Sequence, residues 1–244
     1  MEMHATPPGD AMADRSVLVV GATGGLGFPI SRILASQGAR LTLHGRDETR
    51  LAELAEFGTT VAGDIARADT PRRVVEAAIE AHGRLDGVVY AAGIVAFGSL
   101  EETPDDVLID LFTIDTLAPI RLLRAAMPAL RESAEAKRGP FVAMISAVVA
   151  EQPMPGMAAY SAAKAALTAF DAAAARELRR GGIRLLDVRP PHTETGLATR
   201  PRLGTAPKLQ EGLSPDSVAE RIVTAITSGE KDLPSSAFTA SEGF

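Results

Sequence analysis

Short apolar runs rich in β-branched residues alternate along the chain with longer segments of helical pattern. The apolar runs predict strands at residues 17–20, 40–43, 59–62, 87–91, 141–146 and 184–188. Helical patterns lie between them, with the clearest at residues 30–35, 107–131, 158–180 and 214–227. Strands that alternate with helices form a parallel sheet whose right-handed crossovers place helices on both faces. The pattern therefore predicts an α/β fold built on a single doubly wound parallel sheet.

The length of 244 residues suits one such domain, because two domains would be cramped. We expect a flexible leader at residues 1–14, which contains Pro7, Pro8 and Gly9, followed by one domain from 15 to 244. Residues 232–244 show no clear strand or helix pattern.

Composition excludes several classes of function. The net charge of −6 comes without a basic stripe, so nucleic acid is not an expected partner. Cysteine is absent, which excludes disulfides and thiolate metal sites, and the four histidines lack metal-ligand spacing, so no metal is expected. No apolar run approaches the roughly 20 residues of a membrane helix, and the N-terminus lacks an apolar signal core. We therefore expect a cytoplasmic protein that does not bind membranes.

A glycine-rich turn follows the first predicted strand and precedes a helix, with the spacing Gly-x-x-x-Gly-x-Gly. This is the context of a dinucleotide-binding loop. Glycines let the backbone approach a pyrophosphate closely, and the helix N-terminus offers free N–H groups and a positive dipole end. An ordinary glycine-rich turn is the alternative. The candidate cofactor residues in this loop are Gly21, Thr23, Gly24, Gly25, Leu26 and Gly27.

Tyr160 and Lys164 lie one helical turn apart, so they share a helix face. An ammonium beside a phenol stabilises the phenolate, so it can lower the tyrosine pKa from its usual value of about 10 toward neutrality. Such a phenol can give a proton to a carbonyl oxygen or take one from an alcohol. The spacing also occurs by chance, as a surface tyrosine near a solvated lysine.

The glycine loop and the Tyr-x-x-x-Lys pair, in this order, resemble the short-chain dehydrogenase/reductase family over residues 15–234. The resemblance implies a Rossmann-like fold, a catalytic Tyr160, and a Lys164 that also bonds the nicotinamide ribose. Residues 196–213 match the family's substrate lid, although an inert surface loop is the alternative. Further cofactor positions implied by the resemblance are Asp64 and Ile65 at the adenine, Ala91, Ala92 and Gly93 after the fourth strand, and Pro190, Thr193 and Thr195 at the nicotinamide.

The family resemblance also implies an oligomer. Helices at 107–131 and 158–180 form a four-helix dimer interface in that family, and the second helix is rich in alanine here. We expect a homodimer or homotetramer, the alternative being an alanine-rich helix in the core of a monomer.

The residues at the end of the second predicted strand indicate whether NAD(H) or NADP(H) binds. An acid there would bond the ribose 2′-OH and select NAD(H), but this chain has Gly45 and then Arg46. A guanidinium binds a 2′-phosphate well, and the Thr23 hydroxyl can add a contact. We predict NADP(H) rather than NAD(H); in the alternative, Arg46 only caps a loop beside Asp47.

Two of the four catalytic positions implied by the resemblance depart from the family pattern. Ala147 stands where the serine is expected, and Asp115 stands where the asparagine is expected. Ser146 neighbours Ala147 but points to the opposite face of an extended strand. Ser146 and His192 are the candidates to replace the missing hydroxyl near the substrate, although a histidine such as His192 is more often structural.

The sequence therefore predicts an oxidoreductase that transfers hydride between NADP(H) and a small ketone, aldehyde or alcohol, with Tyr160 as general acid and base. The departures at Ala147 and Asp115 leave a second hypothesis, a dinucleotide-binding sensor or scaffold with weakened catalysis. A lyase or epimerase that uses the same cofactor is a third.

Overall fold

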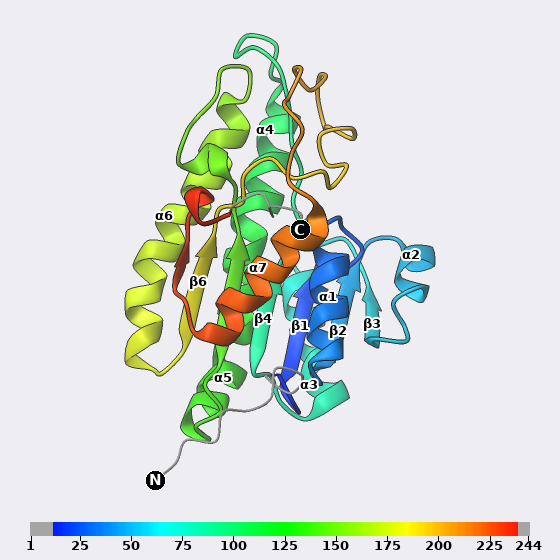
Figure 1. The fold of residues 1–244 in the computed structure, drawn as a ribbon, viewed down its shortest axis with the longest axis vertical. Helices are drawn as coiled ribbons and strands as arrows, with labels where there is room; N and C mark the ends of the chain where they lie inside the picture. Colours follow the sequence, from blue (N-terminus) through cyan, green and yellow to red (C-terminus); the bar gives the residue numbers. More distant parts are fainter. Residues whose placement is uncertain (1–11, 239–244) are drawn as a thin grey trace, which may run out of the picture.

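Seven parallel strands form the centre of the molecule, in the order β3-β2-β1-β4-β5-β6-β7 (Figure 1). The computed structural model describes residues 12–238, so residues 1–11 of the expected leader and residues 239–244 lie outside the described part. All six predicted strands are confirmed, with their ends shifted by at most two residues. The strands are β1 (Ser16–Val20), β2 (Arg40–Gly45), β3 (Gly58–Ala62), β4 (Gly87–Tyr90), β5 (Phe141–Ile145), β6 (Arg184–Val188) and β7 (Asp232–Leu233).

The seventh strand was not predicted, since residues 232–244 show no periodic pattern. β7 has only two residues, and it pairs with the end of β6 in the register Asp187↔Asp232 and Val188↔Leu233. A strand this short shows no alternation in the sequence. Its position is set by the neighbouring strand and by burial of Leu233 in the core.

Helices cover both faces of the sheet, which confirms the doubly wound architecture (Figure 1). α1 and α7 contribute apolar residues to the core cluster on one face, while α3, α5 and α6 contribute to the cluster on the other. The helices are α1 (Gly27–Ser36), α2 (Glu48–Ala52), α3 (Thr70–His82), α4 (Asp105–Phe112), α5 (Ala118–Glu135), α6 (Ala158–Arg180) and α7 (Pro215–Ser228).

The ends of α7 show how local sequence sets a helix boundary. The Ser214 hydroxyl accepts a hydrogen bond from the Ser217 N–H, Pro215 occupies the first turn, and Gly229 adopts a left-handed conformation after the last turn. The serine cap satisfies a backbone N–H that has no partner within the helix. Proline has no N–H that would need a partner in the first turn, and glycine tolerates the positive φ after the last turn.

The prediction of one continuous helix at residues 107–131 is wrong. α4 ends at Phe112, a π-helical turn spans Thr113–Leu117, and α5 then begins. Pro119 has no N–H to donate to the preceding turn, and the Ala118 N–H bonds to the Thr113 carbonyl five residues back. This wider turn carries Asp115, which is fully buried.

The described end of the expected leader packs on the domain. Met12 is buried in the core cluster on the α1 and α7 side. Asp14 forms ion pairs with Arg40 and Arg84. The flexible leader predicted for residues 1–14 is therefore wrong for residues 12–14.

A third apolar cluster lies beyond the carboxyl ends of the strands. It joins the loop after β4, the start of α4, the start of α6 and the segment 196–213. This cluster forms the upper part of the molecule in Figure 1 and one wall of the cavity described below. Within residues 12–238, no helix is long and apolar enough to cross a membrane.

Candidate active site

A cavity of about 420 Å³ opens at the carboxyl ends of the parallel strands, where ligands bind in doubly wound sheets. It is lined by the loops after β1, β4, β5 and β6, the end of β2, the start of α6, and residues 196–213. Every predicted site residue lines it except Gly27 and Asp115. Those that line it are Gly21, Thr23, Gly24, Gly25, Leu26, Arg46, Asp64, Ile65, Ala91, Ala92, Gly93, Ser146, Ala147, Tyr160, Lys164, Pro190, His192, Thr193 and Thr195.

The glycine loop is held so tightly that three of its positions, Gly21, Gly25 and Gly27, admit no side chain. Gly21 has φ of +82°, and a Cβ added to it would lie 2.6 Å from the backbone nitrogen of Ala92. A Cβ on Gly25 would lie 2.5 Å from the Cβ of Thr195. The loop after β1 is therefore packed against the β4 turn on one side and Thr195 on the other. Gly27 lies behind it, at the first position of α1.

The N-terminus of α1 fits an anionic group. Leu26 is the N-cap residue, and no side chain caps the first turn of this ten-residue helix. The N–H groups of a first turn and the positive end of the helix dipole favour phosphate. The chain thus offers a glycine cradle and a helix N-terminus at the same wall of the cavity, as a dinucleotide pyrophosphate requires.

Two arginines lie at the end of the cavity next to β2. Arg46 lines it, as predicted, and so does Arg50, which the sequence analysis missed. Asp47 caps α2 by accepting from the N–H groups of Thr49 and Arg50, so Asp47 itself fills the capping role. Arg50 donates to the Thr23 carbonyl at 2.6 Å, which ties α2 to the glycine loop. Arg46 lies before the N-cap of α2 and Arg50 lies within the helix, so their spacing in the sequence does not bring them together.

His44, at the end of β2, is a second residue that the sequence analysis did not use. Its Nε2 donates to the Gly63 carbonyl at 3.0 Å, and its Nδ1 has no partner among residues 12–238. Burial lowers the pKa of His44 to about 4, so the ring is neutral at physiological pH. His44 therefore positions the turn that contains Asp64 and Ile65.

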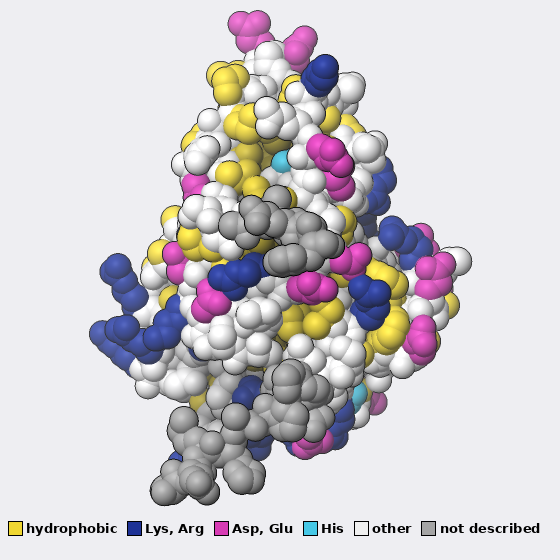
Figure 2. Space-filling view, in the orientation of Figure 1, with side chains coloured by type: hydrophobic (Ala, Val, Ile, Leu, Met, Phe, Trp, Pro, Cys, Tyr) yellow, Lys and Arg dark blue, Asp and Glu magenta, His cyan; other side chains and the backbone are white. Residues whose placement is uncertain are grey.

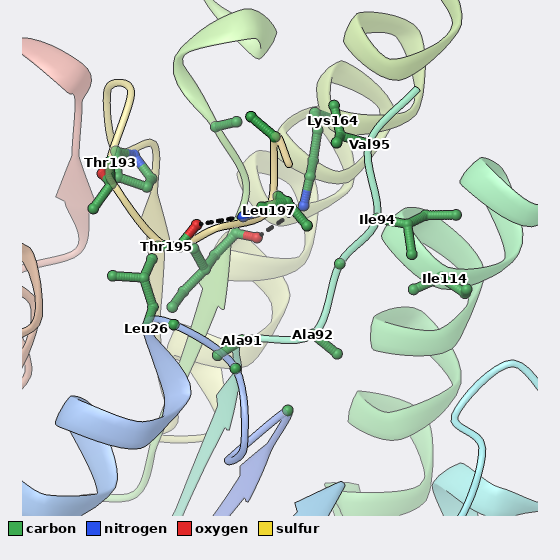
Figure 3. Close-up of a pocket in the computed structure, with 18 of the residues that line it drawn as sticks. Leu26, Ala91, Ala92, Ile94, Val95, Ile114, Lys164, Thr193, Thr195 and Leu197 are labelled. Atoms are coloured by element: carbon green, nitrogen blue, oxygen red, sulfur yellow. Dashed lines mark hydrogen bonds between the residues drawn. The ribbon is translucent and has the colours of Figure 1, made fainter. Parts of the chain in front are cut away.

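Tyr160 and Lys164 both lie in α6 and face the cavity, as predicted. The Lys164 Nζ lies 5.9 Å from the centre of the Tyr160 ring, and it donates to the Ile145 carbonyl at 3.3 Å. Figure 3 shows Lys164 reaching from its helix toward the loop that carries Ala92 and Ile94. Both side chains are more than nine-tenths buried, so the pair works in an environment that excludes most water.

The predicted lowering of the Tyr160 pKa is wrong for this structure. Burial raises the pKa of Tyr160 well above its usual value, and the nearby Asp115 carboxylate raises it further. The Lys164 Nζ lies only 3.4 Å from the Asp115 Oδ1, so the charge that was expected to stabilise a tyrosinate has an opposite charge beside it. The helical spacing reveals Lys164 but not Asp115, so the Tyr160 pKa was predicted to be lowered when it is raised.

Asp115 lies behind Lys164 rather than on the cavity surface. Its Oδ1 accepts from the Ile94 N–H at 3.2 Å, and its Oδ2 has no partner among the described residues. Burial raises the pKa of this carboxyl, against the opposing effect of Lys164. Gly93 leaves the necessary room, since a Cβ there would lie 2.9 Å from the Asp115 Oδ1.

The hydroxyl of Ser146 and one ring nitrogen of His192, the two candidates to replace the missing serine hydroxyl, already have partners. The Ser146 hydroxyl donates to the Lys164 carbonyl and accepts from the Thr168 hydroxyl, each at 3.1 Å. The His192 Nε2 lies 3.2 Å from Glu194, whose carboxylate also accepts from the N–H of Gly212. The Ser146 side chain faces α6. His192 contacts Glu194 just before the segment 196–213, and Glu194 in turn accepts from Gly212 near the end of that segment. Ala147 lines the cavity with no hydroxyl.

The loop after β6 forms the wall next to the glycine loop. The Thr193 hydroxyl donates to the Pro191 carbonyl at 2.9 Å. The Thr195 hydroxyl accepts from the Leu197 N–H at 3.3 Å (Figure 3). Pro190 accepts from the Val148 N–H, which fixes this loop to the end of β5. Thr193 and Thr195 thus lie on a loop that is held on both sides.

The remaining part of the cavity is apolar, and the sequence analysis named none of its lining residues. Figure 2 shows hydrophobic side chains gathered in a hollow in the upper half of this face. Hydrophobic residues from three separate segments contribute. They are Val95, Phe97, Val149, Met154, Met157, Leu197 and Leu209.

The segment 196–213 covers this apolar region and is fastened along one side. The Arg202 N–H bonds to the Val95 carbonyl at 2.7 Å, and the Phe97 N–H bonds to the Leu203 carbonyl at 2.9 Å. The Arg202 guanidinium also pairs with Asp106 and Asp110 of α4 at 2.8 and 2.7 Å. The segment 196–213, predicted to be a lid, is therefore bonded to α4 and to the loop after β4.

A polar stripe continues from the site into the core along α6. Thr168 lies one turn beyond Lys164, and Asp171 lies almost one turn further on the same face. Asp171 is fully buried, and neither of its carboxylate oxygens has a hydrogen-bond partner among the described residues. Burial raises the pKa of Asp171 to about 9, and the nearby Asp187 contributes in the same direction.

Comparison with known proteins gives consistent matches. The family model described as short chain dehydrogenase matches residues 15–204. An ipsdienol dehydrogenase of Ips pini is 30% identical over 197 residues, which cover 77% of this chain and 78% of that protein. The chain spans 61% to 65% of the length of three further curated relatives.

Solved structures resemble the chain over most of its length. A short chain dehydrogenase from Burkholderia cenocepacia, crystallised in complex with NADP, has a TM-score of 0.79 and 25% identity, with 92% of this chain and 97% of that chain covered. A metagenomic short-chain oxidoreductase in complex with NADP has a TM-score of 0.76 and 27% identity, with 92% and 98% covered.

Proposed function

Since the chain belongs to the short-chain dehydrogenase family, we propose that it is an NADP(H)-dependent oxidoreductase that interconverts a ketone or aldehyde and an alcohol. One observation carries the proposal. The glycine cradle, the free N-terminus of α1, and the Tyr160–Lys164 pair all line the same cavity. A dinucleotide and a proton donor can therefore meet in one site.

The preference for NADP(H) over NAD(H) is supported by charge at the β2 end of the cavity. Arg46 and Arg50 line this end, and the chain has no acid at the position after β2 that would select a ribose 2′-OH. Two arginines suit a 2′-phosphate, which accepts several charge-assisted hydrogen bonds. The two similar structures whose descriptions name NADP agree with this preference.

When bound, the nicotinamide supplies or accepts hydride, and Tyr160 handles the proton. The phenol is protonated at neutral pH, so Tyr160 can donate to a carbonyl oxygen, and its raised pKa makes it a weaker acid than an ordinary tyrosine. In the opposite direction, the Tyr160 oxygen must first lose its proton, which the buried environment disfavours.

Lys164 and Asp115 set the charge around Tyr160, and Lys164 is also the residue that would bind the cofactor ribose. Lys164 is held by the Ile145 carbonyl and by Asp115, so its ammonium has a fixed position beside the Tyr160 ring. We assign it to the nicotinamide ribose. Ala147 supplies no hydroxyl to the reacting oxygen, and loss of one such donor typically costs about 10²–10³ in rate. We therefore expect slow turnover.

We also propose a homo-oligomer, a dimer or tetramer. The outer surface of α4, the π-helical turn and α5 exposes three large apolar side chains in sequence, Ile109, Phe112 and Leu117. The neighbouring α6 exposes Ala162 and Ala169, which permit close helix approach. Contact between two such surfaces would cover the apolar side chains.

The test is NADPH oxidation across a panel of ketones and aldehydes, with two matched variants. The chain has two tyrosines, so Tyr160→Phe and Tyr90→Phe each remove one phenol hydroxyl. Tyr90 lies outside the cavity and donates to the Ile114 carbonyl. Tyr160→Phe should retain NADPH binding and lose turnover by about 10²-fold or more, whereas Tyr90→Phe should retain turnover. Tight NADPH binding by the wild type without turnover on any carbonyl would instead support the sensor or scaffold hypothesis.

A further inference from the structure

Arg200 is a cation that lines the cavity and has no assigned role in catalysis or binding. The basic side chains that line the cavity are Arg46, Arg50, Lys164 and Arg200, and the only acidic one is Asp64. Lys164 pairs with the buried Asp115, and Arg46 and Arg50 lie at the β2 end. Arg200 belongs to the segment 196–213, and no carboxylate of residues 12–238 lies within salt-bridge distance of it. Its charge is therefore available to a ligand.

The guanidinium of Arg200 is tethered at the base of this segment. Its Nε donates to the Gly196 carbonyl at 3.0 Å, and its backbone N–H bonds to the Leu197 carbonyl at 3.1 Å. The Thr199 hydroxyl donates to the same Gly196 carbonyl at 2.9 Å. These bonds use the Nε and leave the two Nη groups, which can bind an anion by a fork of hydrogen bonds.

The tether fixes Arg200 to Gly196, which adjoins the part of the chain that lies against the glycine loop. Gly196 directly follows Thr195, and Thr195 is the residue against which Gly25 packs. Gly25 belongs to the glycine loop that precedes α1, whose uncapped N-terminus also favours negative charge. Most apolar residues of the substrate half, such as Phe97 and Met157, belong to other segments, whereas Leu197 and Leu209 belong to the segment 196–213 itself.

We propose that Arg200 binds the pyrophosphate of NADP(H), so that the segment 196–213 is fastened to the dinucleotide at its base and to α4 through Arg202. This inference rests on the proposed function, because it takes NADP(H) as the ligand. Arg202 provides a contrast within the same segment. Its guanidinium pairs with Asp106 and Asp110 outside the cavity, so it fastens the segment without contributing charge to the site.

The experiment measures binding without any carbonyl substrate. NADPH affinity is followed by its fluorescence, and the affinity for 2′-AMP, which has the 2′-phosphate but no 5′-phosphate, is followed by calorimetry. Arg200→Gln should weaken NADPH binding by about tenfold to 100-fold and leave 2′-AMP binding unchanged. Arg46→Gln should weaken both ligands, whereas Arg202→Gln should leave both affinities unchanged.

Three outcomes would overturn the assignment. If Arg200→Gln leaves the NADPH affinity unchanged and raises KM for a carboxylate-bearing carbonyl compound, the anion that Arg200 binds belongs to the substrate. If Arg200→Gln weakens 2′-AMP binding as much as NADPH binding, the effect does not lie at the pyrophosphate. If the wild type binds no NADPH, the proposed function itself fails, a result that the wild-type measurement alone distinguishes from the other two.

Discussion

Asp171→Asn tests whether a buried, unpaired carboxyl makes the fold sensitive to pH. Asp171 is fully buried in α6, both its oxygens lack partners among residues 12–238, and its pKa is raised from 3.8 to about 9. Asparagine has nearly the same shape and does not titrate. The substitution removes one titrating group and changes the packing little. The difference in free energy of unfolding between variant and wild type therefore measures how much ionisation of this buried carboxyl destabilises the fold.

The sign follows from the raised pKa. Between pH 3.8 and about 9, the folded protein keeps a proton on Asp171 that the unfolded chain has released. Its contribution to stability is therefore fully present below pH 3.8 and is lost as the pH rises toward 9. Each pH unit in this window costs about 1.4 kcal/mol, so the loss between pH 6 and pH 8 is about 3 kcal/mol.

The assay is urea unfolding of the wild type and the variant at pH 6 and at pH 8. The difference in free energy of unfolding between variant and wild type cancels the titration of all other groups. We expect that difference to move in favour of Asp171→Asn by about 3 kcal/mol between the two pH values. Asp216→Asn, at an exposed position of α7, should show no such movement. Equal differences at both pH values for Asp171→Asn would refute the reasoning.

Two further predictions concern the catalytic residues. Ala147→Ser should restore a hydroxyl to the cavity wall and raise kcat for carbonyl reduction by about tenfold or more; an unchanged kcat with intact NADPH binding would show that the wild type lacks no donor there. Asp115→Asn removes a negative charge that raises the Tyr160 pKa, so the pH profile of alcohol oxidation should move to lower pH. An unmoved profile, measured as kcat against pH, would show that Asp115 does not act on the tyrosine.

The strands and the cofactor loop were predictable because their sequence signals are local. The β-branched runs mark strands whatever surrounds them, and Gly21 and Gly25 are required by the backbone path of the loop itself. The carboxyl ends of parallel strands then meet at one edge of the sheet, so the motifs after β1, β4 and β6 had to meet in one place. This is why nearly all of the predicted site residues line the cavity.

The features that were missed depend on contacts between distant segments. The pKa of Tyr160 is set by burial and by Asp115, which lies 45 residues earlier and reaches the site through a π-helical turn. β7 forms beside β6 with only two residues, too few for a pattern. Strand alternation did predict that Ser146 points away from the face of Ala147, but its partners on α6 are visible only in the structure. The Tyr160 environment and β7 are not visible in the spacing of residues along the chain.

The central claim is that this site transfers hydride between a nicotinamide and a carbonyl carbon. The direct measurement uses NADPH that carries deuterium at the transferable C4 position, a carbonyl substrate that the wild type reduces, and mass spectrometry of the alcohol. We predict one deuterium on the carbinol carbon of the product, formed about 10²-fold or more slowly when Tyr160→Phe replaces the wild type. NADPH bound tightly but keeping its deuterium against every carbonyl tried would contradict the claim.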